Sequence, residues 1–458
     1  MNFTSLFFLP LYGLTAWLCP RLQSSGRRRL LLFSSWLFFL LESPASGAIL
    51  LFVCLLTWSA GLGMARFAAR PGVRKLLFYT VLAITLGILF LFKYTGLFFL
   101  PAGISFYTFQ ALSYTIDVYR GGFPAERHFP RYALYLSFFP QVVAGPIERP
   151  GSLLEQLRCE KSAGPGDFRV GGFLMLRGYA KKIVIADALS PVVDLLFAGG
   201  GSQPGPRVLA AAVLFALQIY ADFSGYSDIA LGSARMLGIR LSINLREPYL
   251  ARGLRDFWRR WHITLSRWLS DYVYIPLGGN RKGPFRTALN TLLVFAVSGL
   301  WHGRGAHFLI WGLAHGILVL AEDGMRALAK TPCSGYRDSS PVSDFLLRAG
   351  TFLTVSLLWI LFRAPTLSGA LAMYRALPWG WSKAGEFLQW GMTHRLSMLR
   401  ILSAVPLLFL LRRLPDEGDV PPGNKALAGG YFLFVLTLVS LFLNLQSGGA
   451  AAFIYFQF

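Results

Sequence analysis

Long apolar segments separated by short basic or polar loops make up most of the sequence. A helix needs about 20 predominantly apolar residues to cross the hydrocarbon core of a bilayer. The first segment, at 3–19, has no basic leading region and is not followed by a small-residue cleavage site, so we interpret it as a retained span and not as a signal peptide. Further membrane helices are predicted at 30–41, 49–64, 76–92, 168–197, 208–220, 289–300, 308–320, 345–362, 401–411 and 431–445. By segment length, the pattern predicts roughly ten to twelve membrane helices.

Two segments in the middle of the chain, at 104–118 and 132–143, are apolar but short for a span. They carry the polar residues Gln110, Asp117 and Gln141. Irregular or polar backbone at membrane depth is tolerated only where protein or water covers it, so these segments are expected to be re-entrant or buried against other helices. We therefore predict an all-α polytopic integral membrane protein with additional re-entrant and interfacial helices.

The composition excludes several classes of protein. The 458 residues are 54% hydrophobic and only 14% charged, whereas a soluble domain has about 25% charged residues. Soluble, disordered and disulfide-rich proteins are therefore excluded. The four cysteines, Cys19, Cys54, Cys159 and Cys333, show no metal-ligand spacing and are interpreted as membrane or loop thiols.

The chain is strongly basic, with 44 Lys and Arg against 22 Asp and Glu, a formal net charge of +22. A nucleic-acid partner is not predicted, because the basic residues lie in short runs between apolar segments, as the positive-inside rule produces. The basic loops at 21–29 and 66–75 are therefore assigned to the cytoplasm and the N-terminus to the outside. The expected surroundings are membrane lipids.

Residues 251–271 combine tryptophan and arginine at helical spacing. At 100° per residue, Trp261 and Trp268 share a broad apolar face, and His262 lies at its edge. The opposite face carries Arg255, Arg259 and Arg267. This pattern predicts one continuous amphipathic helix in the membrane interface. The helix could serve as a lipid anchor alone, or also as a cytoplasmic docking surface for an acidic partner or a phosphorylated donor.

Three of the six histidines lie within 298–316. His307 and His315 share a predicted helix face with Trp311, whereas His302 stands apart at the end of an apolar run, after Trp301. No carboxylate or cysteine accompanies them at ligand spacing, so no metal site is predicted. Imidazole takes a proton near neutral pH, which favours His302 as a general base. The alternative is a structural histidine bonded to a backbone carbonyl.

Two carboxylates, Asp222 and Asp228, follow the apolar segment at 208–220. They are candidates for acid/base chemistry, but pairing with Arg235 or a neighbouring arginine in a structural network is favoured. The sequence has no GxSxG, P-loop or Gly-rich dinucleotide motif, so it does not support a soluble hydrolase, NTPase or dehydrogenase.

A series of motifs in chain order resembles the membrane-bound O-acyltransferase (MBOAT) superfamily, and within it the bacterial alginate O-acetyltransferase (AlgI-like) branch. The most specific is DFWRRWHITLSRWLSDYVYIPLGGNRKG at 256–283. The others are LPAGISFYTFQALSYTIDVYRG at 100–121, FFPQVVAGPIERP at 138–150, YADFSGYSDIALGSARMLGI at 220–239, NLREPYL at 244–250, SGLWHG at 298–303, WGLAHG at 311–316 and the terminal FIYFQF. The resemblance spans nearly the whole chain.

The resemblance implies a fold and a site. It implies a single MBOAT membrane domain over 1–458, in which N-terminal spans at 1–99 and C-terminal spans at 317–458 flank a core at 100–316, with tilted helices around a central tunnel. His302 matches the catalytic histidine of the family's WHG motif. His262 matches a second polar position about forty residues upstream. Arg255, Arg259, Arg267, Trp261 and Trp301 are then expected on the donor side, where basic residues attract phosphates or an acidic carrier.

The implied activity is transfer of an acetyl group from a cytoplasmic thioester, either acetyl-CoA or an acyl-carrier-protein thioester, across the bacterial inner membrane. A secreted partner of the SGNH type would then acetylate an exported, alginate-like polysaccharide. The enzyme would need no bound cofactor. Peptidoglycan, cellulose and, ranked lower, teichoic acid D-alanylation stay open as alternatives. A polytopic transporter or glycan-export scaffold is the alternative from another class.

Overall fold

The computed structural model describes residues 3, 5, 7–143, 145–159, 162–328, 340–383, 385, 389, 392–412, 429–430, 432–434 and 436–437. These residues form helices and loops and contain no strand, which confirms the all-α prediction. The predicted helix at 431–445 and Cys333 lie largely or wholly outside the described residues. The chain divides into two compact units.

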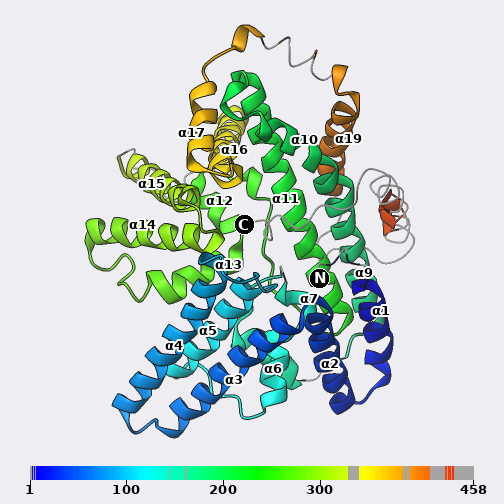
Figure 1. The fold of residues 1–458 in the computed structure, drawn as a ribbon, viewed down its shortest axis with the longest axis vertical. Helices are drawn as coiled ribbons and strands as arrows, with labels where there is room; N and C mark the ends of the chain where they lie inside the picture. The colour runs from blue at the N-terminus through cyan, green and yellow to red at the C-terminus, as the bar shows by residue number, and fades with distance from the viewer. Residues whose placement is uncertain are drawn as a thin grey trace. The chain divides into compact units, whose positions relative to one another are not determined.

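The first unit comprises Met1–Gly178, Tyr226–Ile243 and Pro415–Leu433. Its main helices are α1 (Phe8–Leu18), α2 (Ser24–Glu42), α3 (Pro44–Arg66), α4 (Pro71–Tyr94), α5 (Ile104–Arg120), α6 (Phe129–Ser137), α7 (Phe139–Val142), α8 (Glu155–Cys159), α9 (Pro165–Tyr179) and the C-terminal part of α11 (Gly205–Met236). Proline at the first position begins both α3 and α4, where its fixed φ fits a helix start. Helices α3, α4 and α5 pack side by side (Figure 1).

The short apolar segments of this unit are buried, as predicted. Helix α5 is buried along most of its length. Gln110 donates to the Tyr135 carbonyl at 2.6 Å, and the Gln141 amide donates to Gln110 Oε1 at 2.7 Å. The side-chain amides of both glutamines thus donate to groups of the protein and not to lipid or water.

The second unit comprises Tyr179–Gly225, Asn244–Leu414 and Phe434–Phe458. Its helical elements are η3 (Ala180–Ala186), α10 (Asp187–Ala198), the N-terminal part of α11, α12 (Leu254–Arg260), α13 (Ile263–Leu269), η6 (Ser270–Tyr274), α14 (Gly283–His302), α15 (Ala306–Leu328), α16 (Pro341–Arg363), α17 (Leu367–Ala376) and α19 (Arg395–Arg412). Figure 1 shows α14 and α15 lying side by side.

Five of the described helices are long and apolar enough to cross a membrane, namely α3, α4, α11, α15 and α16. Helix α4 leaves Leu76 68% and Phe90 60% exposed, a surface that suits lipid and not water. The chain is thus a multi-pass membrane protein, and the larger helix number stays a prediction.

Both carboxylates of the YADFSGYSD segment form ion pairs. Asp228 makes two parallel bonds to Arg177, at 2.8 and 2.9 Å, within the first unit. In the second unit, Lys182 Nζ lies 2.8 Å from Asp187 Oδ1 and 2.9 Å from Asp222 Oδ1. These pairs support the structural interpretation, with Arg177 and Lys182 as partners. Arg235 pairs with Asp167.

A π-helical segment creates the Lys182 cluster. Lys182 lies in η3, where the amide of Asp187 donates to the carbonyl of Lys182, five residues earlier. This i→i+5 pattern brings residues five apart onto one face, which an α-helix does not. Lys182 is 1% exposed, so its ammonium depends on the two carboxylates for solvation.

Replacing Lys182 by methionine should therefore destabilise the protein, because two carboxylates would be left buried with no cation. Breaking a buried pair costs about 3–5 kcal/mol. We expect a marked fall in the thermal midpoint of the detergent-solubilised protein. The matched variant Lys182→Met, Asp187→Asn, Asp222→Asn removes all three charges and should recover much of the loss. A single variant as stable as the wild type would contradict this assignment.

Candidate active site

The amphipathic segment at 251–271 is not one continuous helix, and that prediction is wrong. It forms α12 and α13, which are separated at Trp261 (φ −104°, ψ 130°) and His262 (φ 44°, ψ 53°). A left-handed conformation is uncommon for a residue other than glycine. The break carries both side chains into the protein, where each is fully buried. The apolar face of this segment is therefore covered by protein at Trp261 and Trp268, not by lipid.

A carboxylate on α15 fixes the start of α12. Glu322 Oε2 accepts hydrogen bonds from the backbone amides of Leu254, at 2.6 Å, and Arg255, at 3.3 Å. These amides belong to the first turn, which has no partners inside its own helix, and a negative charge also suits this end of the helix dipole. Glu322 thereby ties α12 to α15.

His302 ends α14 and lies in a cluster of aromatic rings. Its ring centroid lies 4.9 Å from that of Trp301, 5.1 Å from that of Trp311 and 5.2 Å from that of Phe362. Only 3% of His302 is exposed. We call His302 and these three residues the aromatic box. Such surroundings exclude water from the imidazole.

The structure brings the two predicted histidines together. The ring centroids of His262 and His302 are 6.4 Å apart, and Trp301 contacts both. His262 also packs against Phe223 at 4.9 Å. Burial lowers the pKa of His262, which lies outside the five candidate spans, to about 3. His262 is therefore neutral at physiological pH and can offer one ring N–H as a donor.

The other two histidines of the 298–316 motif lie on α15, as predicted. His307, Trp311 and His315 are all buried. The indole N–H of Trp258, on α12, donates to Nδ1 of His315 at 3.2 Å. Trp258 also packs against Trp311, with ring centroids 5.8 Å apart. The Trp258–His315 contact thus links α12 to the helix that forms one side of the aromatic box.

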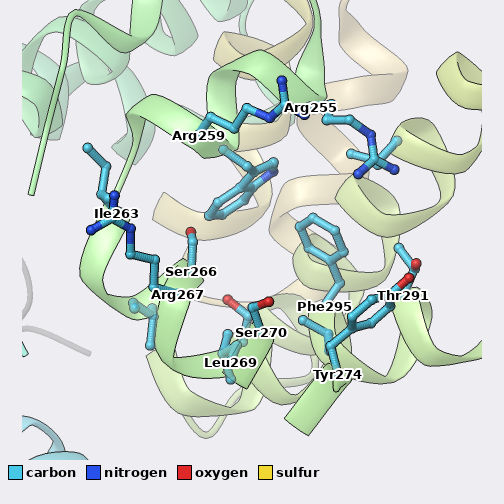
Figure 2. A pocket seen from close by; sticks show the side chains of 15 residues that line it. Arg255, Arg259, Ile263, Ser266, Arg267, Leu269, Ser270, Tyr274, Thr291 and Phe295 are labelled. Carbon is cyan, nitrogen blue, oxygen red and sulfur yellow. The ribbon is translucent and has the colours of Figure 1, made fainter. Parts of the chain in front are cut away.

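A cavity of about 500 Å³ lies between the α12–α13 segment and helices α14 and α15. We call it the arginine pocket (Figure 2). Its lining residues are Arg255, Trp258, Arg259, Ile263, Leu265, Ser266, Arg267, Leu269, Ser270, Tyr274, Thr291, Val294, Phe295, Ser298 and Val319. In Figure 2, Arg255 and Arg259 lie along one side, across from Leu269 and Ser270. The cavity therefore combines guanidinium and hydroxyl groups with an apolar wall.

The three arginines of the pocket differ in their pairing. Arg255 is held by a two-pronged ion pair to Asp323, with Nε 2.9 Å from Oδ1. Within the part of the chain that the structure describes, no carboxylate pairs with Arg259 or Arg267. These two guanidiniums are thus available for an anionic ligand. The other two predicted donor-side residues, Trp261 and Trp301, do not line this pocket. Trp301 packs against both histidines, whereas Trp261 packs against Phe257 and Trp359.

The arginine pocket adjoins the aromatic box. Ile263 directly follows His262, and Ser298 lies one helical turn before His302. Trp258 lines the pocket and packs against Trp311, which in turn contacts His302. Along this path two indole rings, those of Trp258 and Trp311, lie between a ligand in the pocket and the buried imidazole. Among the described residues, no cluster of His, Cys, Asp and Glu is arranged to hold a metal ion.

Several residues of this site could not be recognised from the sequence. Ser270, Tyr274 and Thr291 line the pocket, and Asn244 contacts the segment that follows His262. A hydroxyl or amide side chain on the polar face of a helix cannot be recognised as functional from the sequence alone. Only the fold shows that it lines a cavity or contacts the turn between two helices. Lys182 did carry a signal, because a charge inside an apolar segment is rarely without a role.

Comparison with known proteins identifies the family of this chain. The model of the family "MBOAT, membrane-bound O-acyltransferase family" matches residues 124–364. The chain is 38% identical over 360 residues to a probable alginate O-acetylase AlgI of Pseudomonas fluorescens, covering 77% of this chain and 70% of that protein. It is 41% identical over 279 residues to the probable alginate O-acetylase AlgI of Azotobacter vinelandii, covering 61% of this chain and 54% of that protein.

A third relative is the peptidoglycan O-acetyltransferase of Helicobacter pylori, at 35% identity over 304 residues, 61% of this chain and 56% of that protein. The match to the Azotobacter and Helicobacter relatives thus spans little more than half of their length. The family model covers more than half of this chain and includes α12 to α16 with both buried histidines. The chain belongs to the membrane-bound O-acyltransferase family.

Proposed function

We propose that this protein is a membrane O-acetyltransferase that passes acetyl from a cytoplasmic thioester across the membrane, for O-acetylation of an exported polysaccharide. The observation that carries the proposal is the pair of buried histidines, His262 and His302, beside a pocket with two available arginines. The relatives named as alginate O-acetylases favour an alginate-like acceptor. The peptidoglycan O-acetyltransferase relative supports peptidoglycan as a second candidate acceptor.

His302 is proposed as the general base. Its imidazole takes the proton of the acceptor hydroxyl as the oxygen attacks the thioester carbonyl, a step worth roughly 10²–10⁴-fold in rate. The C–S bond of the tetrahedral intermediate then breaks, and the imidazolium returns its proton to the leaving thiolate. The donors to the oxyanion are a ring N–H of neutral His262 or the indole N–H of Trp301. The aromatic box keeps out water that would hydrolyse the thioester.

The arginine pocket is proposed as the donor site. Acetyl-CoA and an acyl carrier protein both present phosphate on a long thiol-bearing arm. The guanidiniums of Arg259 and Arg267 suit the phosphate, and the apolar lining residues, among them Trp258 and Phe295, suit the arm. Arg255 is the weaker contact of the three, because Asp323 already holds its guanidinium. Passage of the acetyl group toward His302 leads past Trp258.

The basic loops at 21–29 and 66–75 support an inner-membrane orientation with the N-terminus outside. A secreted SGNH-type protein is the proposed partner for the outer transfer step. A transporter or glycan-export scaffold is the competing function, and it predicts tolerance of changes at His302.

Replacing His302 by alanine should abolish acetyl transfer and leave a folded, membrane-inserted protein. Loss of the general base predicts a fall of roughly 10²–10⁴-fold in rate. The measurement is transfer of labelled acetyl in proteoliposomes, together with the acetyl content of exported polysaccharide in cells that lack their own transferase. His307→Ala, a buried histidine of α15 outside the aromatic box, is the matched control. Full acetylation by His302→Ala would overturn the proposal and favour a scaffold.

Neutralising Arg259 and Arg267 together, by Arg259→Gln and Arg267→Gln, should raise the KM for the thioester donor by about tenfold or more, since a hydrogen bond to a charged group contributes about 1.5–3 kcal/mol. The value of kcat should change little, because neither arginine reaches the histidines. Steady-state transfer at varied donor concentration gives both constants. Arg375→Gln, at an exposed arginine of α17 away from the pocket, is the control. An unchanged KM would remove the arginine pocket from the donor path.

A further inference from the structure

We propose that Asn244 is a positioning residue that fixes the backbone turn carrying His262. The inference rests on the proposed function, because it assigns a role within the same site. Asn244 opens the NLREPYL motif and lies eighteen residues before His262 along the chain, in the same compact unit.

The turn at His262 needs support from outside its own helices. A residue other than glycine is strained at a φ of 44°, and such a conformation persists only where the surrounding structure holds it. His262 precedes α13 as its N-cap but makes no capping hydrogen bond with its side chain. The first amides of α13 therefore depend on another group as acceptor.

Asn244, which lies outside both helices, supplies this acceptor. Its backbone carbonyl accepts from the amide of Ile263 at 2.9 Å. Its side-chain Oδ1 accepts from the amide of Thr264 at 3.2 Å and from the Thr264 hydroxyl at 2.9 Å. Two residues further on, the amide of Arg246 donates to the carbonyl of Arg260 at 2.9 Å. The 244–246 segment thus spans the break, with one contact before His262 and three after it.

The contacts at Oδ1 cannot be replaced by solvent. Asn244 is 1% exposed, and an amide that loses its acceptor in a buried setting costs more than the bond itself contributes. Among the described residues no group accepts from the Asn244 side-chain amide, Nδ2. The side chain therefore acts in this contact only through its oxygen, which aspartate would also provide.

Loss of Oδ1 should let the turn relax and shift His262 relative to His302. Catalytic groups are sensitive to such shifts, since a misplacement of about 1 Å can cost about 10²-fold in rate. The arginine pocket has its charges on the exposed side of α12 and α13, so donor binding should be affected much less than the chemical step.

The test compares Asn244→Ala with Asn244→Asp in proteoliposomes, using whichever of acetyl-CoA or acetyl-loaded acyl carrier protein the wild type accepts. We expect Asn244→Ala to lower kcat by about tenfold or more while the donor KM stays within about twofold. Asn244→Asp, which keeps the oxygen acceptor, should restore most of kcat. If Asn244→Ala fails to accumulate in the membrane, Thr264→Val removes one of the same contacts and should lower kcat by a smaller factor, again with KM unchanged.

A double-mutant cycle separates positioning from general stability. Because Asn244 is proposed to act through His262, Asn244→Ala should lower kcat much less in a His262→Gln background than in the wild type. The inference alone is overturned if the wild type transfers acetyl and Asn244→Asp is as impaired as Asn244→Ala, if only KM changes, or if the effect is equal in both backgrounds. A wild-type protein that transfers no acetyl from either donor overturns the proposed function and this inference with it.

Discussion

The break between α12 and α13 is the constraint on which the arrangement of the site depends. A straight helix over 251–271 would keep its arginine and tryptophan faces on opposite sides throughout. The left-handed turn at His262 instead sends His262 and Trp261 into the protein, while Arg259 and Arg267 stay at the pocket. Glu322 fixes the helix before the break and Asn244 the helix after it. Two polar contacts from elsewhere in the chain thus decide where one catalytic candidate lies.

The site separates two environments that acyl transfer needs. The arginine pocket presents the exposed guanidiniums of Arg259 and Arg267, which we propose bind an anionic donor, at a cavity that also has apolar lining residues. The aromatic box surrounds the buried His302 with Trp301, Trp311 and Phe362, which shields the imidazole from water. Trp258 contacts both regions. The proposed reaction therefore begins with a charged, partly exposed binding step and ends with chemistry in a dry interior.

The fold class was predictable from the apolar runs, and the proximity of His262 and His302 from the motifs of the family that the sequence resembles. The arginines at helical spacing pointed to a basic surface, whose role as the donor side stays a proposal. The break at His262 was not predictable, because 251–271 has an unbroken helical period and the residue that holds the turn, Asn244, lies outside this segment. Periodicity also identified the tryptophan face without revealing whether lipid or protein covers it. The Lys182 cluster was not predictable, because a π-helix brings Asp187 beside Lys182 and only the fold brings in Asp222 from α11.

The most direct test of this account is a cryo-electron microscopy structure with S-acetonyl-CoA, a stable thioether analogue of acetyl-CoA. The analogue carries the phosphopantetheine arm common to both candidate donors. The account predicts a phosphate beside Arg259 and Arg267, and a carbonyl carbon that passes Trp258 and stops within about 4 Å of an imidazole nitrogen of His302. A ligand bound outside the arginine pocket, or one whose carbonyl lies far from both histidines, would contradict it.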